Sequence, residues 1–570
     1  MGTSLRYILM LGAVCAAWTH IDAGQIKTIE LDNSTVAKSL SESYVGYDAE
    51  DFACGFNFNW MLTAGRDKFS SYCQAAGVRC LRFAEMNRYS WRGELPTRMM
   101  QAEQMAYLYP KLKDVKINWM QNKLDWWFTP ESFWSFCQEN RIVVLPMFPD
   151  STYYNQKDNN SYAMVNNPAH YKAAAEEAAA YVKWLKDHNY LHLAKVWEIG
   201  NESYQNWKPE EYAAYVKELV KAVRTVQPDI KLAIPTFICT PDNPDVKEVM
   251  KRMTAGNPEI KGSAADIYQT HLKWSGDVIR ELGETAKYIS YGIQHSYGAE
   301  EDYNSNAKGI ETNYKLLLAQ PNSQNWRLVN TEWRDRSGEN LWCHRSFRTG
   351  ALWKAKFVLL MMASPQMDYS CAHSLFAFSG GLYWSDGTKW MKQWPPDGTT
   401  VLSDTGNPDG KPRFALGAFG PVAKMCNDLI DSHPLLLDHQ ADLGKMSSAL
   451  FYKSFYHEVK NVAGDLEWLA ATNANRDSIS MIFVNTKPEA IRVTINTKYG
   501  TALTGAAEVQ ALTCPPDMLD TLGIPGDKAC WSIETCGTHD RPDLDIPGNS
   551  VVKVTFPVDI KNVKTSQSLK

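Results

Sequence analysis

Short apolar runs rich in β-branched and aromatic residues alternate with longer amphipathic segments over most of the chain. Runs of this length, bounded by polar and turn-forming residues, are typical of buried β-strands. Eight runs of this kind predict eight strands: Gly55–Phe58, Arg79–Phe83, Ile142–Phe148, Ala194–Ile199, Ile230–Pro235, Ala265–His271, Arg327–Thr331 and Met367–Ala372.

Helical spacing of apolar residues fills the gaps between these runs, as in Asn167–His188 and Pro209–Val226. Eight short strands alternating with helices predict a closed parallel (β/α)8 barrel, a TIM barrel. A doubly wound open sheet is the main alternative. That fold has fewer strands as a rule, and this sequence has no glycine-rich phosphate loop.

The pattern changes after residue 433, where strand-like segments separated by turns replace the helical periodicity. This region, 433–570, is predicted to be an all-β sandwich, and 46–432 to be the barrel. An early strand-like stretch, Gln25–Leu31, lies within the segment 24–45 and is expected to join the sandwich.

The first residues, 1–23, resemble a secretory signal peptide, with Arg6, an apolar run over Tyr7–Trp18 and a small residue at Ala23. The run is too short to span a bilayer, which needs about 20 apolar residues. The mature protein is therefore expected to be secreted, outside the cell or in a periplasm, with no membrane association.

The charge and cysteine content narrow the classes of partner. The net charge of −5 is spread without long runs and gives no electrostatic footprint for nucleic acid. Twelve cysteines include no Cys-x-x-Cys pair, so neither a structural zinc site nor another metal or cofactor is predicted. Oligomeric state is left open.

Two of the predicted strands end in glutamate. Gly200-Asn201-Glu202 follows the fourth run, and Asn330-Thr331-Glu332 ends the seventh. Catalytic residues of such barrels lie at the carboxyl ends of the strands. Two carboxylates across the barrel mouth suit glycoside cleavage, in which one protonates the leaving oxygen and the other attacks the anomeric carbon. We expect the acid to have a raised pKa and the nucleophile to stay ionised.

The sequences Trp-Glu-Ile-Gly-Asn-Glu at 197–202 and Thr-Glu-Trp at 331–333 resemble the (β/α)8 clan of retaining glycoside hydrolases. The chain is most similar to the α-L-arabinofuranosidase family, with β-xylosidase and heparanase-like relatives behind it. The resemblance implies that Glu202 is the general acid/base, Asn201 binds the sugar 2-hydroxyl and Glu332 is the nucleophile.

The resemblance also implies supporting roles near the catalytic pair. Arg82 corresponds to the clan's arginine that supports the nucleophile, although a plain salt bridge is the alternative. His271, at the end of the sixth run, corresponds to a histidine near the pair; if that strand were Ile289–Tyr297 instead, His295 and Tyr297 would take its place. Family members carry Pro-Gly-Gly after the second strand, where this chain has Ala84-Glu85-Met86.

Further candidates for substrate contact are aromatic or histidine side chains near strand ends. Trp333 would form an aromatic wall beside Glu332, and His373 would line the cleft or be a core histidine. Trp384, in the loop after the eighth strand, would stack on a sugar or pack within the loop. Glu198 would hold Arg82, and Trp197 would be core packing.

These observations predict a retaining glycoside hydrolase acting on an oligo- or polysaccharide, with an α-L-arabinofuranosidase as the specific expectation. Two alternatives remain open. One is an endo-acting polysaccharide hydrolase of the same clan. The other is a carbohydrate-binding protein on a barrel that has lost catalysis, which the presence of both glutamates disfavours.

Overall fold

The computed structural model describes the parts of the chain that build the barrel and the sandwich. These residues are 26–49, 66–83, 130–155, 157–158, 160–236, 264–298, 310, 314–335, 347–364, 366–373, 375, 382–385, 413–416, 418–439, 466–497, 500–501, 505–519, 532–539 and 543–558. The predicted signal peptide, 1–23, lies outside them. No helix of the described residues is long and apolar enough to cross a membrane.

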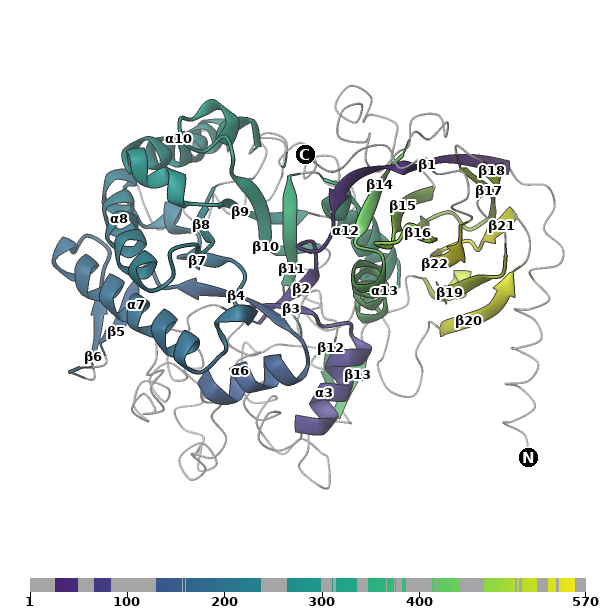
Figure 1. Ribbon diagram of the computed structural model, residues 1–570, viewed down its shortest axis with the longest axis horizontal. Coiled ribbons are helices and arrows are strands. Elements are labelled where there is room, and N and C mark those ends of the chain that lie inside the picture. The colour runs from purple at the N-terminus through teal and green to yellow at the C-terminus, as the bar shows by residue number, and fades with distance from the viewer. Residues whose placement is uncertain are drawn as a thin grey trace.

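Eight parallel strands close into a barrel, which confirms the predicted fold class (Figure 1). In chain order they are β2 (Val45–Asp48), β3 (Cys80–Phe83), β4 (Val143–Phe148), β7 (Trp197–Ile199), β8 (Leu232–Pro235), β9 (Tyr291–Gly298), β10 (Arg327–Asp335) and β11 (Met367–His373). Neighbours in the barrel are neighbours in this order, and β11 pairs with β2 to complete the circle.

Two of the eight predicted strands were wrong. The first barrel strand is β2, Val45–Asp48, and the predicted run Gly55–Phe58 lies outside the described residues. The predicted sixth strand, Ala265–His271, is the first part of the helix α10 (Ala264–Leu282). Buried apolar residues continue through Trp274, Val278 and Leu282, each four positions apart, so the segment is one long amphipathic helix.

Helices follow the strands around the outside of the barrel. They are α3 (Arg66–Ala75), α6 (Pro130–Glu139), α7 (Tyr171–Asp187), α8 (Pro209–Val226), α10, α12 (Lys354–Ala363) and α13 (Phe419–Ser432). The sequence of α8 shows why such a helix forms. Pro209 opens it with its φ already near the helical value, and Glu210 and Glu211 complement the helix dipole. Its buried residues recur three and four apart, which gives one face to the barrel.

The barrel interior is packed with side chains. One apolar layer contains Cys80, Leu145, Val196, Ala233, Tyr291, Ile293, Val329, Tyr369 and Cys371. Gly46 completes this layer because a Cβ there would lie 2.7 Å from the Cys80 carbonyl oxygen and 2.9 Å from Cys371 Sγ. The layer forms an apolar floor below the carboxyl ends of the strands.

The second module is a mostly antiparallel sheet that includes the early strand β1 (Ile26–Ser39). Its other strands are β14 (Leu435–His439), β15 (Leu466–Thr472), β16 (Ser478–Asn485), β17 (Ile491–Thr497), β18 (Gly500–Thr501), β19 (Ala507–Thr513), β20 (Ser532–His539), β21 (Asp543–Ile546) and β22 (Ser550–Pro557). Inward residues from both ends of this sheet share one apolar core, as in a sandwich.

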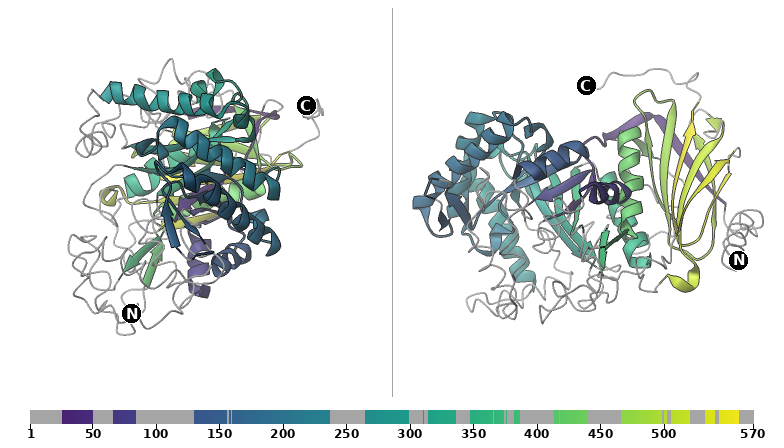
Figure 2. Two further views of the ribbon diagram at one scale, coloured as in Figure 1. Left: turned by 90° about the vertical axis from the view of Figure 1, so that its left-hand side faces the viewer. Right: turned by 90° about the horizontal axis from the view of Figure 1, so that it is seen from below.

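The expected pairing of the early strand is confirmed. β1 runs parallel to β17 over Ile26–Leu31 and antiparallel to β14 over its second half. Figures 1 and 2 show this strand reaching from the barrel side into the sandwich, with α12 and α13 between the two modules. Near the end of β1, Lys38 Nζ donates to the carbonyl oxygens of Met362 and Ser364 at 3.3 and 3.0 Å. The strand therefore fastens the sandwich to the carboxyl end of α12.

Candidate active site

A polar layer lies directly above the apolar floor of the barrel. Side chains on a strand alternate, so residues two positions beyond the floor residues face the same interior. Five polar residues lie two positions beyond a floor residue along the chain. They are Arg82 after Cys80, Glu198 after Val196, His295 after Ile293, His373 after Cys371 and Asp48 after Gly46. Charged and titratable groups from five strands thus meet at the barrel mouth.

Arg82 is the centre of this layer and is fully buried. Its Nε and Nη2 donate to the two carboxylate oxygens of Glu198 at 2.8 and 3.1 Å. Its Nη1 donates at 3.1 Å to both Asp48 Oδ2 and Glu332 Oε2. A second bond from Nη2 reaches Asn201 Oδ1 at 2.7 Å. The expected bond between Arg82 and Glu198 is confirmed, and the same guanidinium also holds Glu332 in place.

Glu332 faces the interior because β10 is irregular at this point. The pairing with β9 skips Thr331, since Asn330 opposes Gln294 and Glu332 opposes His295. An extra residue of this kind re-aims the side chains that follow it. Thr331 Oγ1 lies 3.2 Å from Glu198 Oε2, so both Thr331 and Glu332 point inward.

The same irregularity contradicts the expectation that Trp333 forms a wall of the site. With Glu332 turned inward, Trp333 faces the helices and is 1% exposed. Its ring packs edge-on against Phe357 of α12 and Phe419 of α13, with ring centroids 5.2 and 5.4 Å apart. Trp333 is therefore a core residue. Trp197 is also core, as expected, and stacks on Phe148.

Glu202 lies on the turn after β7. Its backbone is left-handed, with φ 48° and ψ 39°, and it precedes a short helical turn over Ser203–Gln205. About a quarter of its side chain is exposed, at 24%, whereas that of Glu332 is 10% exposed. Glu202 is thus the more accessible carboxylate of the pair, at the rim of the mouth.

His295 joins the two glutamates. Its Nδ1 lies 3.1 Å from Glu202 Oε1 and 3.6 Å from Glu332 Oε2. Its Nε2 lies 3.3 Å from Thr331 Oγ1. The alternative sixth strand is therefore the observed one, because His295 is on β9. His271 lies on the helix α10, not at a strand end.

Burial and neighbouring charges together set the direction in which the pKa values of Glu202, Glu332 and His295 are shifted. Burial raises the pKa of Glu202, but the hydrogen bond and charge of His295 outweigh it and lower that pKa. Burial likewise raises the pKa of Glu332, and the charges of His373, His295 and Arg82 reverse this. Burial lowers the pKa of His295, yet Glu332 and Glu202 raise it overall.

The expected raised pKa of the acid is therefore contradicted. Contact between the two groups instead lowers the pKa of Glu202 and raises that of His295, so the histidine is the more basic partner. The nucleophile candidate, Glu332, is ionised as expected. Because the three groups interact strongly, their protons belong to the cluster rather than to single residues.

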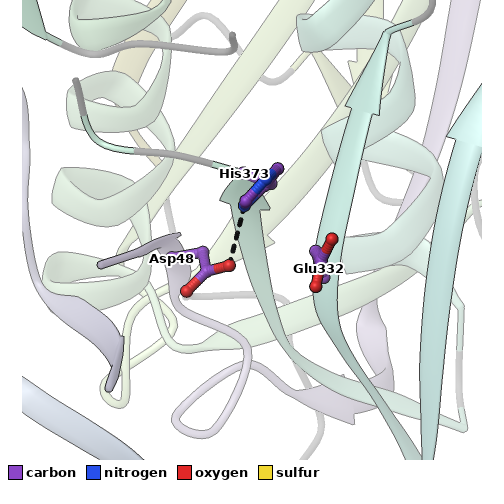
Figure 3. A group of neighbouring side chains, drawn as sticks. All are labelled: Asp48, Glu332 and His373. Carbon is purple, nitrogen blue, oxygen red and sulfur yellow. Dashed lines mark hydrogen bonds and ion pairs between the residues drawn. The ribbon is translucent and has the colours of Figure 1, made fainter. Parts of the chain in front are cut away.

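Asp48 and His373 form a second ion pair beside Glu332 (Figure 3). His373 Nδ1 lies 2.8 Å from Asp48 Oδ2, and ligand atoms of Asp48, Glu332 and His373 all lie within 4.8 Å of one another. Three such groups could in principle hold a metal ion. Arg82 and His373 already bind the Asp48 carboxylate, however, so these contacts describe an ion-paired cluster that fixes Glu332.

Several predicted residues are only partly placed. Tyr297 lies on β9, opposite Arg334 of β10, and nothing is described of its side chain. Trp384 lies on β12 (Leu382–Ser385), which pairs with β13 (Arg413–Leu416) in a small hairpin. Its side chain and the segment 84–86 lie outside the described residues.

The prediction missed Asp48 and Thr331 as members of the site. The wrong first strand hid Asp48, although Val45-Gly46-Tyr47-Asp48 has the buried-run-then-carboxylate form used to find Glu332. Thr331 gave no signal, because strict alternation would have placed either Thr331 or Glu332 inside, never both.

Solved structures with this architecture include several arabinofuranosidases. An α-L-arabinofuranosidase from Thermotoga maritima has a TM-score of 0.59 at 15% identity, over 93% of this chain and all of the other. The arabinofuranosidase from Xanthomonas axonopodis pv. citri has a TM-score of 0.58 at 12% identity, over 93% and 99%.

The chain shares their fold. An α-L-arabinofuranosidase from Bifidobacterium longum is similar over 94% of this chain and all of its own, with a TM-score of 0.57 at 10% identity. The sequence matches no protein-family model and no curated protein. At these identities the likeness establishes the barrel and sandwich architecture, and the chemistry must be argued from the site itself.

Proposed function

We propose that the protein is a retaining glycoside hydrolase, with Glu332 as nucleophile and Glu202 as general acid/base. The observation that carries this proposal is the shared contact with His295. One nitrogen lies within 3.6 Å of an oxygen of each carboxylate, so the two stand close together at the barrel mouth. Close carboxylates favour direct attack by one of them over attack by an intervening water.

The different surroundings of the two glutamates support their different roles. Glu332 is buried and receives a hydrogen bond from Arg82 Nη1, with the charge of His373 nearby, so its carboxylate stays ionised. Glu202 is more exposed and lies against His295, whose pKa the two glutamates raise. A nucleophile needs the first environment and a group that exchanges protons needs the second.

The proposed reaction has two displacements. Glu332 attacks the anomeric carbon while the bond to the leaving oxygen breaks, and Glu202 gives that oxygen a proton. Water then attacks the same carbon, Glu202 takes its proton, and the bond between the sugar and Glu332 breaks. His295 can pass a proton to Glu202 before the first step and take it back after the second, because the two groups are in hydrogen-bond contact.

We further propose a furanoside substrate of the α-L-arabinofuranosyl type. The support is the likeness to solved arabinofuranosidases over nearly the whole chain, including the sandwich. Export from the cytoplasm is proposed as well, from the signal-like sequence at residues 1–23.

The test is a hydrolysis screen of the mature protein on aryl glycosides, including an α-L-arabinofuranoside, and on polysaccharides. Glu332→Gln keeps the side-chain shape and removes the nucleophile, and we expect it to lower kcat by about 10⁴-fold or more. Asp368→Asn is the matched control, because Asp368 is a buried carboxylate near the other end of the barrel, paired with Arg327.

Three results would change the proposal in different ways. Cleavage of polymers alone would keep the mechanism and indicate endo action. Products with inverted anomeric configuration, followed by proton NMR, would contradict Glu332 as nucleophile. Binding of oligosaccharides without any turnover would favour a carbohydrate-binding protein.

A further inference from the structure

The turn that carries Glu202 has an unfavourable backbone. Gly200 has φ +80° and Glu202 has φ +48°, both in the left-handed region. For a residue other than glycine this conformation is disfavoured, because Cβ comes too close to the following carbonyl oxygen. Such backbones persist only where the surrounding structure holds them.

One carboxylate outside the catalytic layer contacts this turn at both ends. Asp150, just after β4, accepts a hydrogen bond from the Ser203 hydroxyl, and Ser203 is fully buried. The same carboxylate packs against Gly200, where a Cβ would lie 2.4 Å from Asp150 Oδ2. Glu202 is therefore enclosed between two points that a single buried side chain fixes.

The chain on either side of Asp150 is itself anchored to the turn. Gly200 N donates to the Phe148 carbonyl oxygen at 2.8 Å. From α8, Tyr215 donates to the Pro149 carbonyl oxygen at 2.8 Å, and Tyr212 to that of Ile199 at 2.6 Å. These bonds prevent Asp150 and the turn from moving apart, so Asp150 can act as a fixed brace.

We propose that Asp150 is a positioning residue for the general acid/base. It holds the turn from Gly200 to Ser203 in the conformation that aims Glu202 at His295, and it touches neither glutamate of the pair in any contact described above. This inference rests on the proposed function and adds the group that orients its acid/base step. It also gives Ser203 a role, because the Ser203 hydroxyl is buried against Asp150.

The test uses two aryl glycosides of the same sugar that differ in leaving group. A phenol of low pKa leaves without a proton, whereas one of high pKa requires the general acid. Ser203→Ala removes the hydroxyl and Asp150→Ala removes the brace. We expect kcat/KM for the poor leaving group to fall by about 10-fold and about 100-fold respectively, as misplaced catalytic groups do.

For the good leaving group, kcat/KM should stay within about threefold of wild type, since its first step needs no acid. Asp150→Asn keeps the shape and one oxygen acceptor and should recover most of the loss. Asp368→Asn, at the other end of the barrel, should lower kcat/KM for both substrates by the same factor, if it lowers kcat/KM at all. Equal losses on both substrates in Asp150→Ala would overturn the inference, because they indicate a merely structural role.

A second readout is independent of turnover. The pKa of His295, followed by NMR in histidine-labelled protein and assigned with His295→Gln, depends on its contact with Glu202. Ser203→Ala, which changes no charge, should lower that pKa; an unchanged value would contradict the brace. A wild-type protein that cleaves no glycoside would contradict the proposed function instead, and this titration would still decide the role of Asp150.

Discussion

Two clusters of buried charged side chains differ in how fully their carboxylates are hydrogen-bonded. At the barrel mouth, Arg82 bonds to three carboxylates and an amide, all between 2.7 and 3.1 Å. At the boundary between barrel and sandwich, Lys356 of α12 faces Glu467 of β15 at 3.9 Å, and Glu467 Oε1 has no hydrogen-bond partner.

The difference in geometry gives a difference in protonation. Around Glu332, the charges of His373, His295 and Arg82 hold the pKa of the buried carboxylate below its usual value. Lys356 is one distant charge, and burial raises the pKa of Glu467 to about 7. Glu332, with three cationic groups around it, therefore keeps a lowered pKa despite its burial, whereas Glu467, with one distant lysine, does not. The proposed reaction requires an ionised Glu332 at the barrel mouth, whereas no reaction is proposed at the boundary.

The largest expected effect comes from removing the centre of the first cluster. Arg82→Met would leave Asp48, Glu198 and Glu332 buried together without compensation. Loss of one partner of a buried pair costs about 3–5 kcal/mol of unfolding free energy. Urea denaturation should show this loss, with activity falling in the soluble fraction. Arg82→Lys, which keeps the charge and loses the fork, should recover part of the stability and little of the activity; full recovery of both would break the comparison.

The cluster at the boundary, Lys356 and Glu467, should make the unfolding free energy depend on pH. The pKa of Glu467 in the folded protein, about 7, is above its value of about 4.3 in the unfolded chain. Between these values the unfolded chain holds fewer protons, so the unfolding free energy falls as pH rises. Glu467→Gln should remove this fall, worth roughly 2–3 kcal/mol between pH 5 and 8.

Denaturation curves at several pH values measure this difference. Glu508→Gln, an exposed change on β19, controls for the loss of one charge from the sandwich. Parallel pH dependences in wild type and Glu467→Gln would contradict a proton-binding boundary. They would also remove the contrast with the barrel mouth.

The sequence predicted those features that depend on one segment at a time. Glu202 and Glu332 follow buried runs whose period is plain in the sequence, and both reach the mouth. Trp333 was misjudged because an extra residue at Thr331 reversed the alternation, and that residue is fixed by pairing with β9. His271 was wrongly placed at the end of a strand, because seven residues of a long helix resemble a strand when only local hydrophobicity is considered.

Long-range contacts carry no local signal at all. Asp150 and Ser203 are adjacent only because β4 and β7 are neighbours in the barrel. Neither residue stands out by type or by spacing. A brace of this kind follows from the topology, so it becomes visible only when the strand order is known.

The smallest expected effect lies at His295, and it tests whether the mouth works as one proton-sharing cluster. The pKa of His295 in the folded protein is raised, so its stabilising contribution is fully present below its unfolded pKa of about 6.5 and is lost as pH rises through the folded value. The lowered pKa values of Glu202 and Glu332 have the opposite consequence, because their contribution is lost as pH falls through them. His295→Gln should therefore cost most near pH 5–6, by about 1–2 kcal/mol.

Thermal unfolding across pH would measure that cost, with His188→Gln as the control because His188 lies on the exposed end of α7. The cost of His295→Gln should shrink as the pH rises through the raised pKa of His295. A cost that grows toward pH 8 would mean that a neutral histidine stabilises the pair. Glu202 would then hold the transferable proton itself, and the acid/base would resemble the simple raised-pKa carboxyl first expected from the sequence.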